Sequence, residues 1–160
     1  MTFSTIPKSK YFMMPVAVHL ILQQKEDVLL LLRQGTGFCD GRYSVIAGHL
    51  DGGESATEAM IREAKEEAGI DISPSDLEFS CVLHRYSPDR ESIDLFYLCK
   101  IWRGEIRNME PHKCGELHFF PINTLPENMV EYVRDGVQKS VKRQPYSEFG
   151  WENNNVKTAI

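Results

Sequence analysis

The chain has 160 residues, of which 42% are hydrophobic and 26% are charged, and its formal net charge at pH 7 is −5. That length suits a single domain with its own buried core. The acidic balance argues against a protein whose main task is to hold long nucleic acid, because the phosphate backbone of such a ligand favours a basic surface. It is compatible with a small phosphorylated substrate whose charge is met by a metal ion.

The sequence carries no sign of secretion or of a membrane span. Residues 1–14 contain no sustained apolar core of the kind that a signal peptide needs, and no apolar run approaches the ~20 residues that cross a bilayer. The cysteines show no C-x-x-C spacing, which favours reduced thiols over a zinc site; they are Cys39, Cys81, Cys99 and Cys114. We therefore expect a cytoplasmic protein with no membrane partner.

We expect an N-terminal arm over 1–14, one folded domain over 15–143 and a frayed polar tail over 144–160. Apolar runs bounded by turn residues predict strands, and apolar residues at helical spacing predict helices. In chain order the expected strands are 16–22, 28–32, 43–47, 77–86, 93–102 and 117–121, with helices over 56–68 and 129–140. A turn at 25–27 joins the first two strands into a hairpin.

Glycines and a helix occupy the stretch from Gly48 to Ile70. Ser55 and Glu58 have the spacing of a capping box, which predicts where the helix begins. Gly69 suits the left-handed position at which a helix ends. Small apolar residues recur along one face of this helix, at Ala56, Ala59, Met60, Ala64 and Ala68.

Three carboxylates share another face of the same helix, because Glu63, Glu66 and Glu67 stand at i, i+3 and i+4. Two unit charges at that spacing repel by roughly 3 kcal/mol at an effective dielectric constant of about 20. A divalent cation relieves such crowding, and oxygen ligands suit Mg²⁺ or Mn²⁺. The alternative is a solvated acidic face on which Arg62 and Lys65 offset part of the charge.

The loop before the helix favours the metal site over the solvated face. Gly48, Gly52 and Gly53 are expected to take positive φ and to let the backbone approach a ligand closely. Glu54 lies just before the helix, where it can pair with Arg62.

This pattern of glycines, Glu54, the Arg62-Glu63 pair, the Glu66-Glu67 pair and Gly69 resembles the signature of the Nudix (MutT-like) hydrolases. The one departure is Ala64, where the family more often carries a bulkier aliphatic residue. The resemblance implies an α/β (α+β) fold: an α-β-α sandwich with a mixed β-sheet and a loop-helix-loop metal site. It also implies an enzyme that uses Mg²⁺ or Mn²⁺ to hydrolyse a nucleoside diphosphate linked to another group.

The resemblance further implies roles for single residues. The metal ligands would be the three helical glutamates, the backbone carbonyl of Ala47 and a glutamate from a later loop, for which Glu110 is preferred over Glu116. Glu63 or Glu110 would orient or deprotonate the attacking water. Glu54 would hold Arg62 and so keep loop and helix in register.

Candidate substrate contacts lie outside the motif. Arg33 and Asn128 stand where MutT-like enzymes contact the nucleotide and its base, although a solvent-exposed strand end and a helix N-cap are the alternatives. Phe38 and Tyr43 are expected either to stack on a base or to pack beneath the loop. His19, inside an apolar run, is expected to be a satisfied core histidine.

His84 and Arg85 are expected either to reach phosphate from a strand end or to be exposed to solvent.

The leading expectation for the substrate is a nucleoside triphosphate, cleaved to nucleoside monophosphate and pyrophosphate. Alternatives are a nucleoside diphosphate sugar or alcohol, the 5′ end of RNA, or a non-catalytic nucleotide sensor. The partner is thus a small nucleotide, and the sequence leaves open a monomer or a homodimer.

Overall fold

The computed structural model describes residues 10–152, and the parts of the expected arm and tail at 1–9 and 153–160 lie outside the described residues. Its strands are β1 (Val16–Gln24), β2 (Asp27–Arg33), β3 (Tyr43–Ser44), β4 (Ile46–His49), β5 (Leu77–Ser87), β6 (Arg90–Cys99), β7 (Cys114–Pro121) and β8 (Tyr146–Phe149). Its helices are α1 (Ala56–Ala68), a 3-10 turn η1 (Pro74–Asp76) and α2 (Glu131–Val141). None of these helices combines the length and apolarity that a membrane crossing requires.

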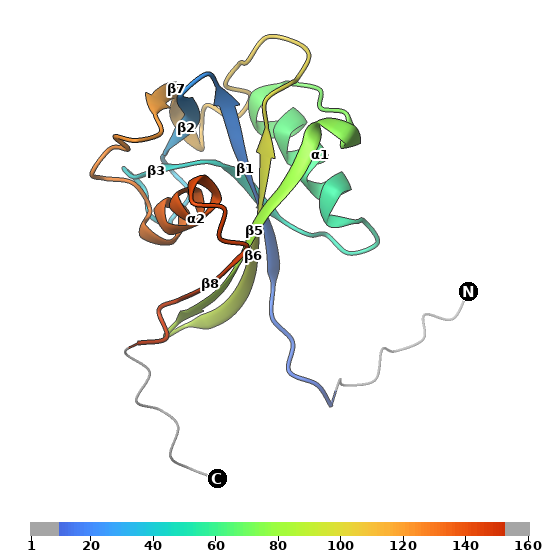
Figure 1. The fold of residues 1–160 in the computed structure, drawn as a ribbon, viewed down its shortest axis with the longest axis vertical. Coiled ribbons are helices and arrows are strands. Elements are labelled where there is room, and N and C mark those ends of the chain that lie inside the picture. The colour runs from blue at the N-terminus through green and yellow to red at the C-terminus, as the bar shows by residue number, and fades with distance from the viewer. Residues whose placement is uncertain (1–9, 153–160) are drawn as a thin grey trace.

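The strands form one mixed sheet in the order β3-β2-β1-β6-β5-β8, with β4 paired to β1 and β7 paired to β2. The β1–β6 and β5–β8 pairs are parallel and the other pairs are antiparallel. Helices α1 and α2 lie on opposite sides of the sheet (Figure 1). The predicted mixed α/β (α+β) sandwich is confirmed.

Strand β1 is covered on both faces, which explains why its sequence is apolar without alternation. Val18, Leu20 and their same-face neighbours pack in the cluster that includes Met60 of α1. His19 and Ile21 point to the other face, which α2 covers. The expected hairpin of β1 and β2 is also present, with Gln24 opposite Asp27.

The single strand expected over 43–47 is two strands, and the second extends into the predicted loop. Strand β4 pairs with β1 through Gly48, opposite Val18, and through His49, opposite Ala17. The backbone of Gly48 is therefore held by its pairing with strand β1. The free loop of the motif is confined to residues 50–55.

The prediction of a frayed tail from residue 144 onward is wrong for the part that the structure describes. Strand β8 pairs in parallel with β5, and Trp151 Nε1 donates to the His84 carbonyl oxygen at 3.0 Å. The polar sequence hid this pairing because a short edge strand is held mainly by backbone hydrogen bonds, which leave no apolar pattern.

Candidate metal and substrate site

Local sequence fixes where α1 begins and ends. The Ser55 side chain accepts from the Glu58 N–H while the Glu58 carboxylate accepts from the Ser55 N–H, so the predicted capping box is present. Gly69 takes a left-handed φ of 70° and donates to the Lys65 carbonyl. Ala64, the departure from the family pattern, is fully buried against the sheet. The helix therefore turns its small residues inward and its glutamates toward the end of β4.

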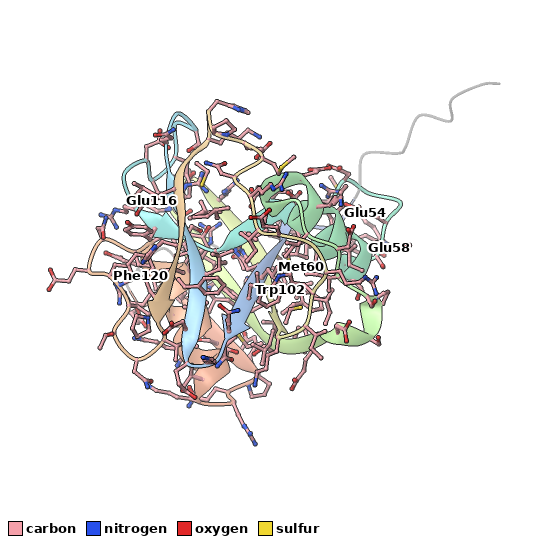
Figure 2. All side chains as sticks on the ribbon, turned by 90° about the horizontal axis from the view of Figure 1, so that it is seen from above. Glu54, Glu58, Met60, Trp102, Glu116 and Phe120 are labelled. Carbon is pink, nitrogen blue, oxygen red and sulfur yellow. The ribbon has the colours of Figure 1, made fainter. Side chains whose placement is uncertain are left out.

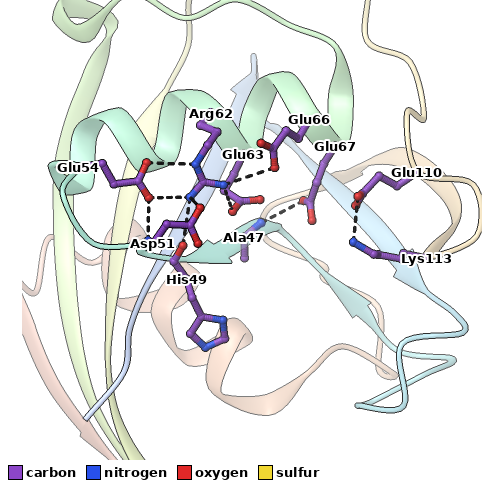
Figure 3. A network of polar contacts seen from close by, with 10 residues as sticks. All are labelled: Ala47, His49, Asp51, Glu54, Arg62, Glu63, Glu66, Glu67, Glu110 and Lys113. Atoms are coloured by element: carbon purple, nitrogen blue, oxygen red, sulfur yellow. Dashed lines mark hydrogen bonds and ion pairs between the residues drawn. The ribbon is translucent and has the colours of Figure 1, made fainter. Parts of the chain in front are cut away.

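Arg62 is the centre of the polar network that Figure 3 shows. Its guanidinium donates to Glu54 Oε1 at 2.7 Å and Oε2 at 3.1 Å, as expected, and to the His49 carbonyl at 3.1 Å. It also donates to Glu63 Oε1 at 2.6 Å and more weakly to Glu66 Oε2 at 3.4 Å. Hydrogen bonds from Arg62 and from the Asp51 N–H lower the pKa of Glu54 to about 2. The Glu54–Arg62 ion pair joins the loop to helix α1.

Glu67 lies beyond the reach of this cation. Its Oε2 accepts from the Ala47 N–H at 3.1 Å. Burial raises the pKa of Glu67 to about 8, and the charges of Glu63 and Glu110 add to the rise against the opposing Ala47 hydrogen bond. Burial also raises the pKa of Glu63, although Arg62 opposes it. Among the described residues, Glu67 thus has a backbone N–H and no side-chain cation as its hydrogen-bond partner.

Gly48 is required for space and not for a left-handed backbone. A Cβ built at Gly48 would lie 1.9 Å from Glu63 Oε1, so any side chain there would displace the carboxylate. Positive φ occurs, as predicted, at Gly52 (79°) and Gly53 (76°), but the expectation of positive φ at Gly48 is wrong because that residue belongs to strand β4.

The donor set fits a hard divalent cation. Carboxylates of Glu63, Glu66 and Glu67, with the backbone of Ala47 alongside, provide the oxygen ligands that Mg²⁺ and Mn²⁺ prefer. Across residues 10–152, no three side chains of His, Cys, Asp or Glu already converge on one point. Binding of a cation would therefore require Glu63 and Glu66 to exchange contacts with Arg62 for contacts with the ion.

The two candidate glutamates of the later loop lie in different places. Glu110 lines the same cavity as Glu67 and pairs with Lys113 at 2.9 Å. Glu116 on β7 accepts a hydrogen bond from the Tyr43 hydroxyl, and Figure 2 shows it across the molecule from Glu54 at the start of α1. The geometry brings Glu110, and not Glu116, to the carboxylates.

A cavity continues from Glu67 and Glu110 across the face of the sheet that α2 covers. Cations line it together with aromatic and small residues. The cations are Arg33, Arg85, Arg90 and Lys113, and the other lining residues include Phe38, Ala47, Gly48, Tyr132 and Asp94. Such a mixture of acidic and basic groups beside aromatic rings suits a phosphorylated ligand with a ring system.

Two of the four expected substrate residues line this cavity. Arg33 donates to the Phe38 carbonyl at 2.8 Å, and its guanidinium lies 5.4 Å from the centre of the Phe38 ring. Tyr43 and Asn128 do not line it.

Instead, the Asn128 side chain donates to the Gly41 carbonyl at 3.1 Å and its backbone carbonyl accepts from the Tyr43 N–H. The alternative role of Asn128 as a helix N-cap is wrong, because Val130 occupies the N-cap position of α2.

The sequence analysis missed a polar cluster in the lining of the cavity. Asp94 contacts both His19 and Arg85, while Arg85 lies 4.1 Å over the Tyr132 ring. His19 and Asp94 are 75 residues apart in the chain, so no local motif marks the pair. The only signals were a histidine and an aspartate inside otherwise apolar strands.

The family comparison agrees with the motif. The family model described as NUDIX domain matches residues 13–140. In the crystal structure of a MutT NUDIX hydrolase from Burkholderia pseudomallei, 98% of the chain aligns with 80% of this one at a TM-score of 0.74 and 22% identity. That likeness supports the fold.

Two relatives extend the comparison. The NAD-capped RNA hydrolase NudC of Stutzerimonas stutzeri is 32% identical over 107 residues, which are 67% of this chain but only 37% of that protein. The ADP-ribose pyrophosphatase of Methanocaldococcus jannaschii is 30% identical over 128 residues, covering 76% of this chain and 71% of that protein. Since the family model covers most of its length, the chain belongs to the Nudix (MutT-like) hydrolase family, and the resemblance read from its motif is confirmed.

Proposed function

We propose that the chain is a divalent-metal-dependent pyrophosphohydrolase that cleaves a nucleoside diphosphate linked to another group. The observation that carries the proposal is the gathering of Glu63, Glu67 and Glu110 at the edge of a cation-lined cavity, where the buried Glu67 has no cation as hydrogen-bond partner among the described residues. Nudix hydrolases generally need divalent metal ions, and a site short of positive charge is what such an ion would complete.

The proposed division of labour follows the positions of the residues. Glu63, Glu66, Glu67 and the Ala47 carbonyl would hold the ion, with Glu110 either holding it or orienting the water. When bound, Mg²⁺ or Mn²⁺ neutralises phosphate charge and lowers the pKa of bound water. Arg33 and Lys113 line the cavity near these carboxylates and would bind phosphate oxygens. Glu54 keeps Arg62 in place.

For the substrate we propose a nucleoside diphosphate derivative of the ADP-ribose class ahead of a nucleoside triphosphate. The names of the relatives favour the first, since both ADP-ribose and NAD contain a diphosphate that joins two groups. The preference for triphosphates drew in part on the family matches at Arg33 and Asn128, and Asn128 does not line the cavity. The net charge of −5 disfavours RNA ends, and the full set of motif carboxylates disfavours a sensor.

A substrate panel tests the proposal. Purified protein with Mg²⁺ or Mn²⁺ would be offered ADP-ribose, NADH and the nucleoside triphosphates, with products identified by mass spectrometry in H₂¹⁸O. We expect metal-dependent cleavage of a pyrophosphate bond, with ¹⁸O in one phosphate product. Glu26→Gln, a change at an exposed glutamate in the β1–β2 turn, should behave like the wild type. Binding of these nucleotides with metal but without turnover would contradict the proposal.

A further inference from the structure

His19 is buried at the cavity with only one of its two ring nitrogens satisfied. Its side chain lines the cavity although the residue is only 2% exposed. Nε2 lies 2.9 Å from Asp94 Oδ1, whereas Nδ1 is buried and has no hydrogen-bond partner among the described residues. A buried polar atom without a partner is uncommon, so this nitrogen needs an explanation.

The surroundings of Asp94 decide which kind of partner Nδ1 can take. Asp94 Oδ2 accepts from Arg85 Nε at 3.1 Å and from Ser92 Oγ at 2.9 Å. Burial opposes ionisation, but His19 and Arg85 outweigh it and lower the pKa of Asp94 to about 2. The ionised carboxylate accepts a hydrogen bond from the Nε2–H group of His19. In the neutral ring, Nδ1 is then an acceptor.

The ring is held in this orientation and lines the same cavity as Glu67. It stacks on Phe96 with centroids 4.6 Å apart and meets the edge of Tyr132 at 5.8 Å. In the β1–β4 ladder His19 is directly opposite Ala47, whose N–H holds Glu67. Residues opposite each other in a ladder have neighbouring side chains, so His19 is next to Ala47 in the lining of the cavity that Glu67 also lines.

We propose that His19 Nδ1 determines substrate specificity by accepting a hydrogen bond from an N–H or O–H group on the nucleoside part of the substrate. This inference rests on the proposed function, since it concerns the same cavity. Phosphate oxygens are the wrong partner, because they carry no donor and would face both a lone pair and the Asp94 carboxylate behind the ring. Asp94 and Arg85 act as positioning residues that fix which nitrogen faces the cavity.

Two substitutions separate this role from a structural one. In His19→Gln the amide nitrogen replaces Nε2 and keeps a donor for Asp94, while the Nδ1 acceptor is lost. In His19→Asn the amide oxygen replaces Nδ1, but the side chain is too short to reach Asp94 as the ring does. If His19 is purely structural, the Gln variant should behave more like the wild type than the Asn variant. If His19 binds the substrate, the Asn variant should keep the wild-type substrate specificity better than the Gln variant.

The readout is kcat/KM for substrates that differ by one donor. On the best nucleotide of the panel, base amino groups and the 2′- and 3′-hydroxyls would be deleted one at a time. For the wild type we expect one deletion to lower kcat/KM by about 10- to 100-fold. For His19→Gln we expect a similar loss with the parent substrate and no further loss with that analogue.

His84→Gln is the matched control, because His84 Nε2 is also buried without a hydrogen bond but His84 does not line the cavity. It should keep the wild-type preference. Thermal unfolding of each variant reports whether the fold is intact.

The outcomes distinguish this inference from the proposed function. If no nucleotide is cleaved, the proposed function fails, and calorimetric binding of the same analogue pairs still tests His19. Loss of discrimination in His19→Gln supports the inference in either assay. Unchanged discrimination in that variant overturns it, and so does a wild type indifferent to every deletion. Weaker binding of inorganic pyrophosphate to His19→Gln would also overturn it, by assigning the ring to phosphate.

Discussion

Two charge clusters lie against the same sheet and differ in how their negative charge is neutralised. The first, here the carboxylate cluster, comprises Glu63, Glu67 and Glu110; burial, with a smaller contribution from the charges of Glu63 and Glu110, raises the pKa of Glu67 to about 8. The second, the Asp94 cluster, comprises Asp94, His19 and Arg85, and its donors lower the pKa of Asp94 to about 2.

The difference shows which cluster depends on something outside the chain. Asp94 receives hydrogen bonds from two side chains with basic groups and from Ser92, so folding alone satisfies it. Glu67 receives one backbone N–H, while the Arg62 guanidinium is shared among Glu54, Glu63 and Glu66. We therefore propose that a bound cation completes the carboxylate cluster, whereas the carboxylate of Asp94 finds its partners within the chain.

The largest expected effect comes from breaking the carboxylate cluster. Glu67→Gln should lower turnover by about three orders of magnitude or more, because a lost metal ligand removes several kcal/mol of transition-state stabilisation. Steady-state release of products at saturating Mg²⁺ measures it, with Glu26→Gln as control. Turnover in Glu67→Gln within a few-fold of the wild type would remove Glu67 from the mechanism.

Breaking the Asp94 cluster should act on stability. Asp94→Ala leaves two buried basic groups without their carboxylate, and we expect the free energy of unfolding to fall by about 3–5 kcal/mol. Urea unfolding at pH 7 measures this. The exposed Lys65–Asp71 pair at 3.0 Å offers the comparison: Asp71→Ala should cost less than about 1 kcal/mol. Equal losses in the two variants would contradict the contrast.

The raised pKa of Glu67 predicts how the stability of the protein depends on pH. The pKa of Glu67 in the folded protein is raised from 4.5 to about 8, so its contribution to stability is full below pH 4.5 and is lost as the pH rises through 8. Gln mimics the protonated side chain. Without metal, Glu67→Gln should therefore be more stable than the wild type at pH 9, on the order of a few kcal/mol, and similar at pH 4.5.

Thermal unfolding at both pH values, in the presence of a chelator, checks this prediction. A stability difference between Glu67→Gln and the wild type that does not change with pH would contradict the raised pKa. Addition of Mn²⁺ should remove the penalty in the wild type, because the ion replaces the proton as partner of the carboxylate.

Sequence reasoning succeeded where the determinants are local. The capping box, the left-handed Gly69 and the Arg62–Glu54 pair all lie within the stretch Gly48–Ile70, and the structure has each of them. It failed where contacts join distant segments. Strand β8 owes its place to the edge of β5, and His19 meets Asp94 across strands far apart in the sequence.

The candidate site shows the same division. The helical glutamates were predicted to share a face, but their division between Arg62 and the Ala47 N–H depends on where β4 lies against α1. Arg33 was expected at the ligand because of its position before the motif, and Phe38 was expected either to stack on a base or to pack beneath the loop; both line the cavity. Tyr43 and Asn128 were also candidates for substrate contacts, yet their backbones hydrogen-bond to each other and neither residue lines the cavity.

The smallest of the predicted effects of substitution concerns the Glu54–Arg62 pair. Glu54→Gln should keep the fold and weaken metal affinity by about 10- to 100-fold, since Arg62 would lose its ionised partner and pair more strongly with Glu63 and Glu66. Titration with Mn²⁺, followed by its paramagnetic effect on water relaxation, measures the affinity. An unchanged titration would contradict the role of Glu54 in positioning Arg62.

The central claim is that the carboxylate cluster is completed by a divalent cation, and calorimetric titration of Mn²⁺ at pH 7 tests it most directly. Run in two buffers of different ionisation enthalpy, the titration also counts released protons. We predict that the wild type takes up Mn²⁺ and releases protons, because Glu67 must ionise to bind it, and that Glu67→Gln binds more weakly and releases fewer. Absence of Mn²⁺ uptake by the wild type, or identical titrations of the two proteins, would contradict the account.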